Sequence, residues 1–313
     1  MAPLFGLHMP NFSFPDLPPE RLFDRVVETA QAAEAAGFDL LTVMDHFYQI
    51  SIVGPETEPM LEAYAVLSAL AMATSKVRLG TLVTGVTYRN PALLAKTVTT
   101  LDTISKGRAI LGIGAAWNDS EHTGYGIAFP PVRERMDRLG EALTIAKLMF
   151  TEDRPSFEGE HYQIDRALNV PRPIQPGGPK ILVGGSGERR TLRLAAQHAD
   201  MTHWFVPTPE EFTRKNAVLE EHCRSVGRDP STITKTIGAP VWLALNEQDA
   251  RAAAEQMPPA RRATMRPATP EQAAEILKSF MDVGVQGFTF NSPNLSTPEL
   301  LAAAGTVKQM LGA

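Results

Sequence analysis

Short apolar runs alternate with longer amphipathic segments along this chain of 313 residues, and this alternation limits the possible folds more than any other feature. Several runs are apolar at nearly every position, which is typical of parallel strands that are buried on both faces. The expected strands are Phe5–Met9, Leu40–Met44, Val77–Val83, Ala109–Gly114, Ile181–Gly184, Met201–Phe205, Lys235–Leu245 and Gly287–Phe290.

The segments between these runs carry apolar residues at helical spacing. In the first of them, Leu22, Val26, Ala30 and Ala33 would share one face, and Gly37 marks the end of the helix. Prolines stand near the start of several segments, where a helix has no hydrogen bond for them to break. The expected helices are Pro19–Ala36, Glu62–Thr74, Pro91–Ile104, Arg133–Met149, Glu188–His198, Pro209–Val226, Pro270–Val283 and Pro298–Leu311.

Eight strands that alternate with eight helices predict an α/β fold, a (β/α)8 TIM barrel that forms one domain over residues 1–313. A doubly wound open sheet is the structural alternative, because alternation alone does not prove that the sheet closes.

Two segments interrupt the alternation and are interpreted as insertions, near residues 151–179 and 246–269. The first predicts a tight hairpin around residues 157–164, followed by an extended stretch rich in proline. The second begins with a predicted helix, Glu247–Gln256, and continues without periodicity, which we interpret as a mobile loop over the site. The arginines of this loop are Arg261, Arg262 and Arg266.

Composition excludes several classes of function. The net charge of −5 and the pI near 5.9 leave no basic field for general nucleic-acid binding. One cysteine, Cys223, cannot form an internal disulfide framework, and the seven histidines lack metal-ligand spacing, so no metal site is expected. No secretory leader and no long apolar stretch are found, so we expect a cytoplasmic protein that does not span a membrane.

In a barrel, the active site lies at the C-terminal ends of the strands. The second strand ends in Asp45 and His46, which would place an imidazole that titrates near neutral pH beside a carboxylate. The alternative is a pair that only holds its own loop in place. Phe47 and Tyr48 follow, and residues 49–61 form a long loop that is able to cover a ligand.

The third and fourth strands end in residues suited to a flat ligand. Thr84, Gly85 and Val86 place a glycine where a ligand could approach the backbone closely, although an ordinary strand-end glycine would look the same. After the fourth strand, Trp117 offers a large aromatic face unless it is a core residue, and Asn118 follows it. The Gly-x-Gly that precedes them lacks the third glycine of a dinucleotide-binding motif. Glu121 and His122 come next in the chain.

The fifth strand runs into a glycine-rich turn before a predicted helix, and the turn comprises Gly184, Gly185, Ser186 and Gly187. Free N–H groups and the positive end of the helix dipole suit a phosphate there, and a tight turn without a ligand is the alternative. On the sixth strand, His203 is a further candidate for the site.

Taken together, these residues resemble the luciferase-like monooxygenase superfamily and, within it, the F420-dependent oxidoreductases. The resemblance covers nearly the whole chain. It is carried by Val43-Met-Asp-His-Phe, by the block from Val77 to Pro91, by Gly107-Arg-Ala-Ile-Leu-Gly-Ile-Gly-Ala, by Glu134-Arg-Met-Asp-Arg-Leu-Gly-Glu-Ala-Leu and by Ile181-Leu-Val-Gly-Gly-Ser-Gly-Glu.

The resemblance implies a barrel with extra segments, usually a homodimer, that holds a flavin or deazaflavin edge-on at the ends of the strands. It also implies a non-prolyl cis peptide, which maps to Gly85–Val86, and a cofactor phosphate on Gly184–Gly187. Asp45 and His46 resemble the deazaflavin-using members, so F420 is the expected cofactor and FMN the alternative. The residues expected to hold it are Asp45, His46, Thr84, Gly85, Val86, Trp117, Asn118, Gly184, Gly185, Ser186 and Gly187.

The expected reaction is hydride transfer between the deazaflavin C5 and a small organic substrate. His46 is the expected proton donor or acceptor, and Asp45 would orient it or tune its pKa. The substrate pocket is expected to include Phe47, Tyr48, Trp117 and His203, with His203 as a second proton candidate. The arginines of the second insertion would meet the anionic tail of the cofactor.

Two other functions remain open on the same fold. One is an FMN-dependent monooxygenase that uses reduced flavin and oxygen, and the other is a protein that binds a deazaflavin without turnover. Some sugar-phosphate dehydrogenases of the family place a catalytic glutamate just after the fourth strand, where this chain has Trp117. That departure argues against sugar-phosphate oxidation.

Overall fold

Eight parallel strands close into a barrel in this computed structural model, which describes residues 2–257, 259–262, 264–291, 293–295 and 297–312. Around the ring the order is β1, β2, β3, β5, β8, β9, β10 and β13, and β13 pairs with β1 while β3 pairs with β5. Closure confirms the TIM barrel over the open sheet. The strands are β1 (Leu4–Met9), β2 (Leu40–Val43), β3 (Arg78–Thr81), β5 (Ala109–Gly114), β8 (Lys180–Gly184), β9 (Met201–Trp204), β10 (Thr234–Gly238) and β13 (Gly287–Asn291).

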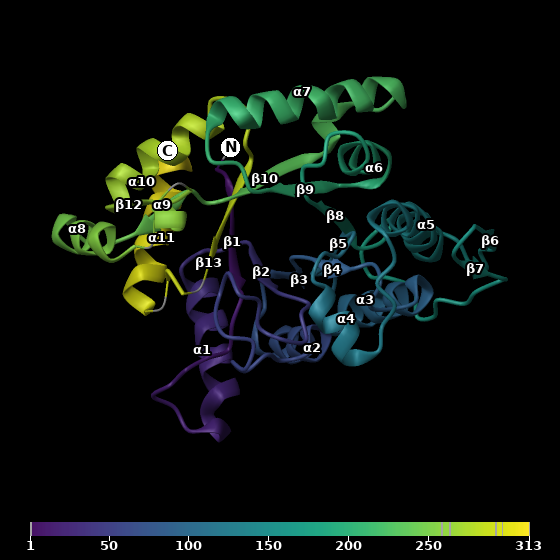
Figure 1. Cartoon of the computed structure of the whole chain (residues 1–313), viewed down its shortest axis with the longest axis horizontal. Helices are drawn as coiled ribbons and strands as arrows, with labels where there is room; N and C mark the ends of the chain where they lie inside the picture. The colour runs from purple at the N-terminus through teal and green to yellow at the C-terminus, as the bar shows by residue number, and fades with distance from the viewer. Residues whose placement is uncertain (1, 258, 263, 292, 296, 313) are drawn as a thin grey trace.

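Helices lie around the strands and cover their outward residues (Figure 1). Trp204 of β9, for example, is fully buried against Phe212, with 5.3 Å between the ring centroids. No helix in the described ranges is long and apolar enough to span a bilayer. The helices that follow or precede the strands are η1 (Pro19–Arg21), α1 (Leu22–Ala35), α2 (Ala63–Ala73), α3 (Pro91–Ser105), α5 (Val132–Thr151), α6 (Thr191–His198), α7 (Pro209–Ser225), η2 (Pro230–Thr232), α10 (Pro270–Met281) and α11 (Pro298–Gly312).

Two predicted strands are interrupted in the structure. The run Val77–Val83 ends as β3 at Thr81, and the chain resumes as β4 (Thr84–Gly85), which pairs with β5. The run Lys235–Leu245 divides into β10 and β11 (Val241–Leu243), and Pro240 lies in the gap, where it has no N–H to offer a ladder. The apolar runs therefore overestimated the length of both strands, because the sequence does not show where a strand stops pairing with one neighbour and begins pairing with another.

The first insertion is confirmed as a hairpin of β6 (Phe157–Glu158) and β7 (Gln163–Ile164). Its proline-rich continuation is fixed by the buried carboxylate of Asp102 on α3. That carboxylate accepts hydrogen bonds from the backbone N–H groups of Ile174 and Gln175, at 2.8 and 3.1 Å.

The second insertion begins with the expected helix, α8 (Glu247–Gln256), but the prediction of a mobile loop after it is wrong. The chain forms α9 (Pro259–Arg262) and then β12 (Arg266–Ala268), which pairs in parallel with β11 outside the barrel. Arg261 lies 5.9 Å from the Trp242 ring, and Arg262 donates to the carbonyl of Met257. The guanidinium groups of both arginines therefore have partners, which the lack of periodicity in the sequence of the insertion did not indicate.

The inside of the barrel changes character along its axis. Toward the starts of the strands, Leu40, Ile110, Leu182 and Met201 form a small apolar cluster of inward residues. Toward the C-terminal ends of the strands, which we call the mouth, β5 and β8 contribute only glycines, while the opposite strands contribute polar side chains. Because side chains alternate along a strand, every second residue faces the inside of the barrel, and these residues occupy such positions. The inward residues at this level are Gly112, Gly114, Gly184, His8, Thr42, His203 and Thr236.

Gly112→Ala tests the close approach of β3 and β5 that closes the barrel. A Cβ at this position would lie 1.9 Å from the carbonyl oxygen of Thr81, which is backbone. We expect the variant to lose about 3 kcal/mol or more of unfolding free energy in urea titrations. Gly140→Ala on α5 is the matched control, since its Cβ would meet only a side-chain methyl at 3.3 Å, and it should change stability by less than about 1 kcal/mol. Equal effects of the two variants would contradict the account.

Candidate active site

A fully buried carboxylate, Glu121, organises the polar groups at the mouth. It lies on α4 (Asp119–Tyr125), a short helix after β5 that the sequence did not predict. Its Oε1 accepts hydrogen bonds from His46 Nδ1 and Asn118 Nδ2, both at 2.6 Å. Its Oε2 accepts from the Phe47 N–H at 2.9 Å and from the Tyr88 hydroxyl at 3.0 Å. Four donors therefore converge on one side chain.

This arrangement determines the protonation of the groups involved. Burial raises the pKa of Glu121, but hydrogen bonds from His46 and the Phe47 backbone outweigh burial and hold it below its ordinary value. Burial and the Glu121 charge raise the pKa of Tyr88, so its hydroxyl remains a donor. Because an ionised carboxylate only accepts, His46 must donate through Nδ1. The Nε2 of a neutral His46 is then a free acceptor on a side chain that is 13% exposed.

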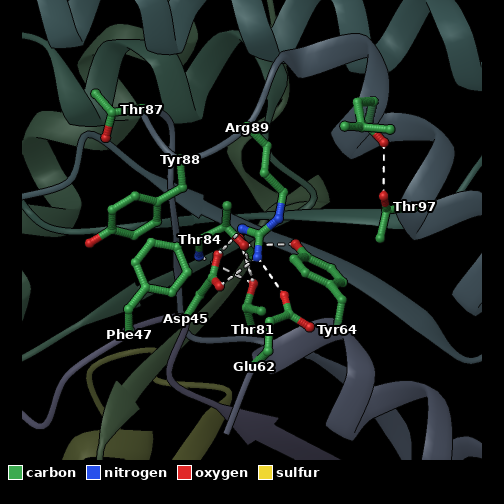
Figure 2. A network of polar contacts seen from close by, with 12 residues as sticks. Asp45, Phe47, Glu62, Tyr64, Thr81, Thr84, Thr87, Tyr88, Arg89 and Thr97 are labelled. Carbon is green, nitrogen blue, oxygen red and sulfur yellow. Dashed lines mark hydrogen bonds and ion pairs between the residues drawn. The ribbon is translucent and has the colours of Figure 1, made fainter. Parts of the chain in front are cut away.

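A second network holds the residue before His46. Arg89 forms a two-pronged ion pair with the buried Asp45, at 2.5 and 3.0 Å, and donates to Glu62 at 2.6 Å (Figure 2). Burial raises the pKa of Asp45 while the Arg89 charge opposes the rise, so the carboxylate depends on its partner to stay ionised. Asp45 was expected to orient His46 directly. Glu121 occupies the imidazole Nδ1 instead, and the expected tuning of the His46 pKa by Asp45 stays a prediction.

Hydroxyl groups extend this network beneath Arg89. The Tyr64 ring lies 4.8 Å from the guanidinium, and its hydroxyl is 2.7 Å from that of Thr84. The Thr84 hydroxyl in turn lies 2.9 Å from the Thr81 hydroxyl (Figure 2). The Thr81 hydroxyl donates to the carbonyl of Gly112. Thr84, expected to contact the cofactor, is thus completely buried within this network. Its contribution here is to tie β4 to β3 and β5.

Aromatic side chains surround the polar centre. Phe47 packs against Tyr88 and Tyr125, with centroids 4.8 and 4.7 Å apart, and Tyr48 lies 5.5 Å from Tyr125. Trp117 stands edge-on to His46 at 5.7 Å and is 56% exposed, so it is not a core residue. Their assignment to a substrate pocket stays a prediction.

A cavity of about 500 Å³ lies beside Trp117. A larger one of about 650 Å³ opens at the opposite end of the barrel, between the starts of the strands, where barrel enzymes do not place their chemistry. We therefore place the candidate site at the mouth. The mouth cavity is lined by Gln49, Ile50, Ser51, Gly54, Pro55, Glu56, Trp117, Asn118 and Ser120.

Glycines form a low floor around Val83. A Cβ on Gly184 would lie 2.8 Å from the Val83 side chain, and one on Gly114 would lie 2.9 Å from it. The non-prolyl cis peptide is Leu82–Val83, so its expected place at Gly85–Val86 is wrong. Gly85 belongs to β4, and Val86, in the turn that follows, donates from its N–H to the carbonyl of Gly114. A floor without bulky side chains fits a flat ring.

The glycine-rich turn after β8 has features of an anion site. Gly185 adopts a φ of +101°, a conformation that side chains rarely allow. The Lys215 ammonium lies 3.1 Å from the Ser186 carbonyl and 2.9 Å from the Glu188 carboxylate, which brings a cation to the turn. The helix after it begins at Thr191, three residues later than predicted, because residues 188–190 form a turn first. These residues fit the phosphate of a cofactor.

The sequence identified His46, Asp45, Trp117, Asn118 and the glycine-rich turn as site residues, and all lie on the mouth side of the barrel. It assigned no role to Glu121, Tyr88 or Arg89, although these make most of the contacts. Arg89 and Glu121 are both charged residues that come soon after the end of a barrel strand, and that position was the signal that could have identified them. In the described ranges, no group of three or more potential ligands is placed to hold a metal ion.

Comparisons with known proteins agree with this architecture. Relatives include the F420-dependent glucose-6-phosphate dehydrogenase of Kineococcus radiotolerans, 38% identical over 164 residues, which is 52% of this chain and about half (48%) of that protein. The enzyme of the same name from Segniliparus rotundus is 28% identical over 302 residues, 86% of this chain and 88% of that protein.

Solved structures with the same fold include an F420-dependent secondary alcohol dehydrogenase in complex with an F420-acetone adduct, at a TM-score of 0.79 and 22% identity, covering 98% of each chain. The EDTA monooxygenase of Chelativorans sp. BNC1 has a TM-score of 0.85 and 14% identity, covering 100% of this chain and 94% of that one. The model of the luciferase-like monooxygenase family matches residues 4–306. Because that match spans nearly the whole chain, this protein belongs to the luciferase-like monooxygenase family.

Proposed function

We propose that this protein is an F420-dependent oxidoreductase in which His46 exchanges a proton with a small, neutral organic substrate. The observation that carries the proposal is the His46–Glu121 pair, which leaves His46 Nε2 free at the mouth. The names of the relatives and the F420-acetone adduct of a structural neighbour support the cofactor.

F420, when bound, supplies a ring carbon, C5, that takes up or releases a hydride. The floor of Val83, Gly114 and Gly184 would support its ring, and the Gly184–Gly187 turn with Lys215 would hold its phosphate. His46 Nε2 would take the hydroxyl proton of an alcohol as the carbon is oxidised, or return it to a carbonyl. The buried Glu121 carboxylate would stabilise the imidazolium that forms, as an acceptor at 2.6 Å.

The cavity at the mouth favours a neutral substrate over a sugar phosphate. Its lining contains no lysine or arginine among the described residues, and Glu56 contributes a negative charge. Arg89 is already paired with Asp45 and Glu62. A phosphate group would therefore lose its hydration without finding a cation, although relatives are named glucose-6-phosphate dehydrogenases. Assembly as a homodimer and a cytoplasmic location stay predictions.

Cofactor choice is tested by titrating the purified protein with F420 and, separately, with FMN. We expect fluorescence quenching to give a dissociation constant for F420 at least about tenfold lower than for FMN, which corresponds to about 1.4 kcal/mol. Tighter FMN binding, together with oxygen consumption on addition of reduced FMN, would move the protein to the monooxygenase alternative. Binding of F420 without turnover of any alcohol or carbonyl compound would favour the non-catalytic alternative.

His46→Ala tests the proton role. We expect turnover with F420 to fall at least about 100-fold, because general acid–base catalysis contributes about that much, while F420 affinity stays within a few-fold. His161→Ala, on the turn of the β6–β7 hairpin, is the matched control and should keep full activity. Unchanged turnover in His46→Ala would remove His46 from the mechanism.

Glu121→Gln tests whether Glu121 is ionised in the folded protein. Because the pKa of Glu121 is depressed, its stabilising effect is complete above pH 4.5, the ordinary pKa of glutamate, and is lost as the pH falls through the lower folded value. The variant should lose about 1–3 kcal/mol of unfolding free energy at neutral pH, and the deficit should shrink below pH 4.5. Urea titrations at several pH values measure this, and a pH-independent deficit would refute it.

A further inference from the structure

His203 is a buried histidine that the proposed proton transfer does not use. It lies on β9 and is 2% exposed, and its strand neighbour Trp204 packs outward on α7. Because side chains alternate along a strand, the His203 imidazole points into the barrel. It pairs in register with Gly184 of β8, so the floor beside it carries no side chain.

The hydrogen bonds around His203 determine its tautomer. The Thr236 hydroxyl donates to the carbonyl of Thr202 at 2.7 Å, so its oxygen can only accept from His203 Nδ1, which lies 3.0 Å away. The neutral ring therefore carries its proton on Nδ1, and Nε2 is an acceptor. Nε2 is buried and has no hydrogen-bond partner in the part of the chain that the structure describes.

The unpaired Nε2 of His203 stays unprotonated. Burial and the nearby His8 lower the pKa of His203 to about 3, so the ring is neutral at physiological pH. A buried acceptor without a partner destabilises a fold, and native structures rarely keep one unless a water or a ligand completes it. The site is thus matched to a group that donates a hydrogen bond.

His8 on β1 repeats the arrangement closer to the surface. Its Nδ1 lies 3.0 Å from the Thr42 hydroxyl on β2, and its side chain is 7% exposed. Burial and the proximity of His46 lower the pKa of His8 to about 4, so this ring is also neutral. The exposed fraction of the three imidazoles thus falls from 13% at His46 to 7% at His8 and 2% at His203.

We propose that His203 Nε2 accepts a hydrogen bond from a second hydroxyl group of the substrate, besides the one that exchanges its proton with His46. The substrate class is then a neutral polyhydroxy compound rather than a simple alcohol. Phe205 meets the His203 ring edge-on at 5.2 Å and is 76% exposed, so it is the side chain that moves aside for the ligand. This inference rests on the proposed function in one respect, namely that the ligand donating to His203 is the substrate.

Nitrogen-15 NMR of histidine-labelled, F420-loaded protein tests the proposal, with His203→Phe used to assign the resonances. We expect Nδ1 of His203 to be protonated and Nε2 unprotonated from about pH 5 to pH 8. Propylene glycol should shift the Nε2 resonance saturably, whereas its dimethyl ether, which lacks donors, should bind at least about tenfold more weakly. A proton on Nε2, equal shifts with both probes, or no saturable shift with the glycol would each overturn the proposal.

Two variants separate this subsite from the catalytic role. Thr236→Val removes the hydroxyl that accepts from His203 Nδ1 and fixes the tautomer. In the folded variant, we expect the glycol-induced shift to fall several-fold. His46→Ala should abolish turnover and leave the glycol shift at His203 unchanged. In the wild-type protein, a glycol shift without hydride transfer would refute the proposed function and retain the subsite, and hydride transfer without the shift would do the reverse.

Discussion

The mouth of this barrel depends on one buried carboxylate. Glu121 has no exposed surface, and burial of an ionised group is unfavourable unless its hydrogen-bonding capacity is met. Four donors from three different segments meet it, and they include the side chain of His46 and the backbone of Phe47. Because the same interaction satisfies the charge and aims the imidazole, the geometry of the site follows from an electrostatic requirement of the fold.

The barrel separates two kinds of histidine by burial. His46 keeps part of its surface at the mouth and is hydrogen-bonded to a carboxylate. His8 and His203 lie deeper and are paired with threonine hydroxyls, and their pKa values fall to about 4 and about 3. In the two proposals, identical side chains serve as proton carrier and as neutral acceptor, and the difference arises from burial and from the charge of the partner.

Sequence reasoning was most successful where a pattern is local. The strands β1, β5 and β13 and the helices α3 and α7 were predicted within one or two residues, because burial on both faces or at helical spacing leaves a repeated signal. It failed at the change of partner after Thr81 and at β12, since ladder pairing is decided by residues distant in the chain. Asp45 and His46 could be identified because they are neighbours in the sequence at the end of a predicted strand. Their true partners, Arg89 and Glu121, lie 44 and 75 positions away, and one sequence gives no means of pairing them.

The position of Glu121 on α4 also bears on how such a barrel can change its chemistry. His46 lies three residues after the end of the core strand β2, whereas its partner lies on a seven-residue helix in the connection that follows β5. Exchange of that one connecting segment would replace the carboxylate without disturbing the ring. The barrel therefore carries the imidazole in one part of the chain and the carboxylate that accepts its hydrogen bond in another, so each can be changed by substitution of its own segment.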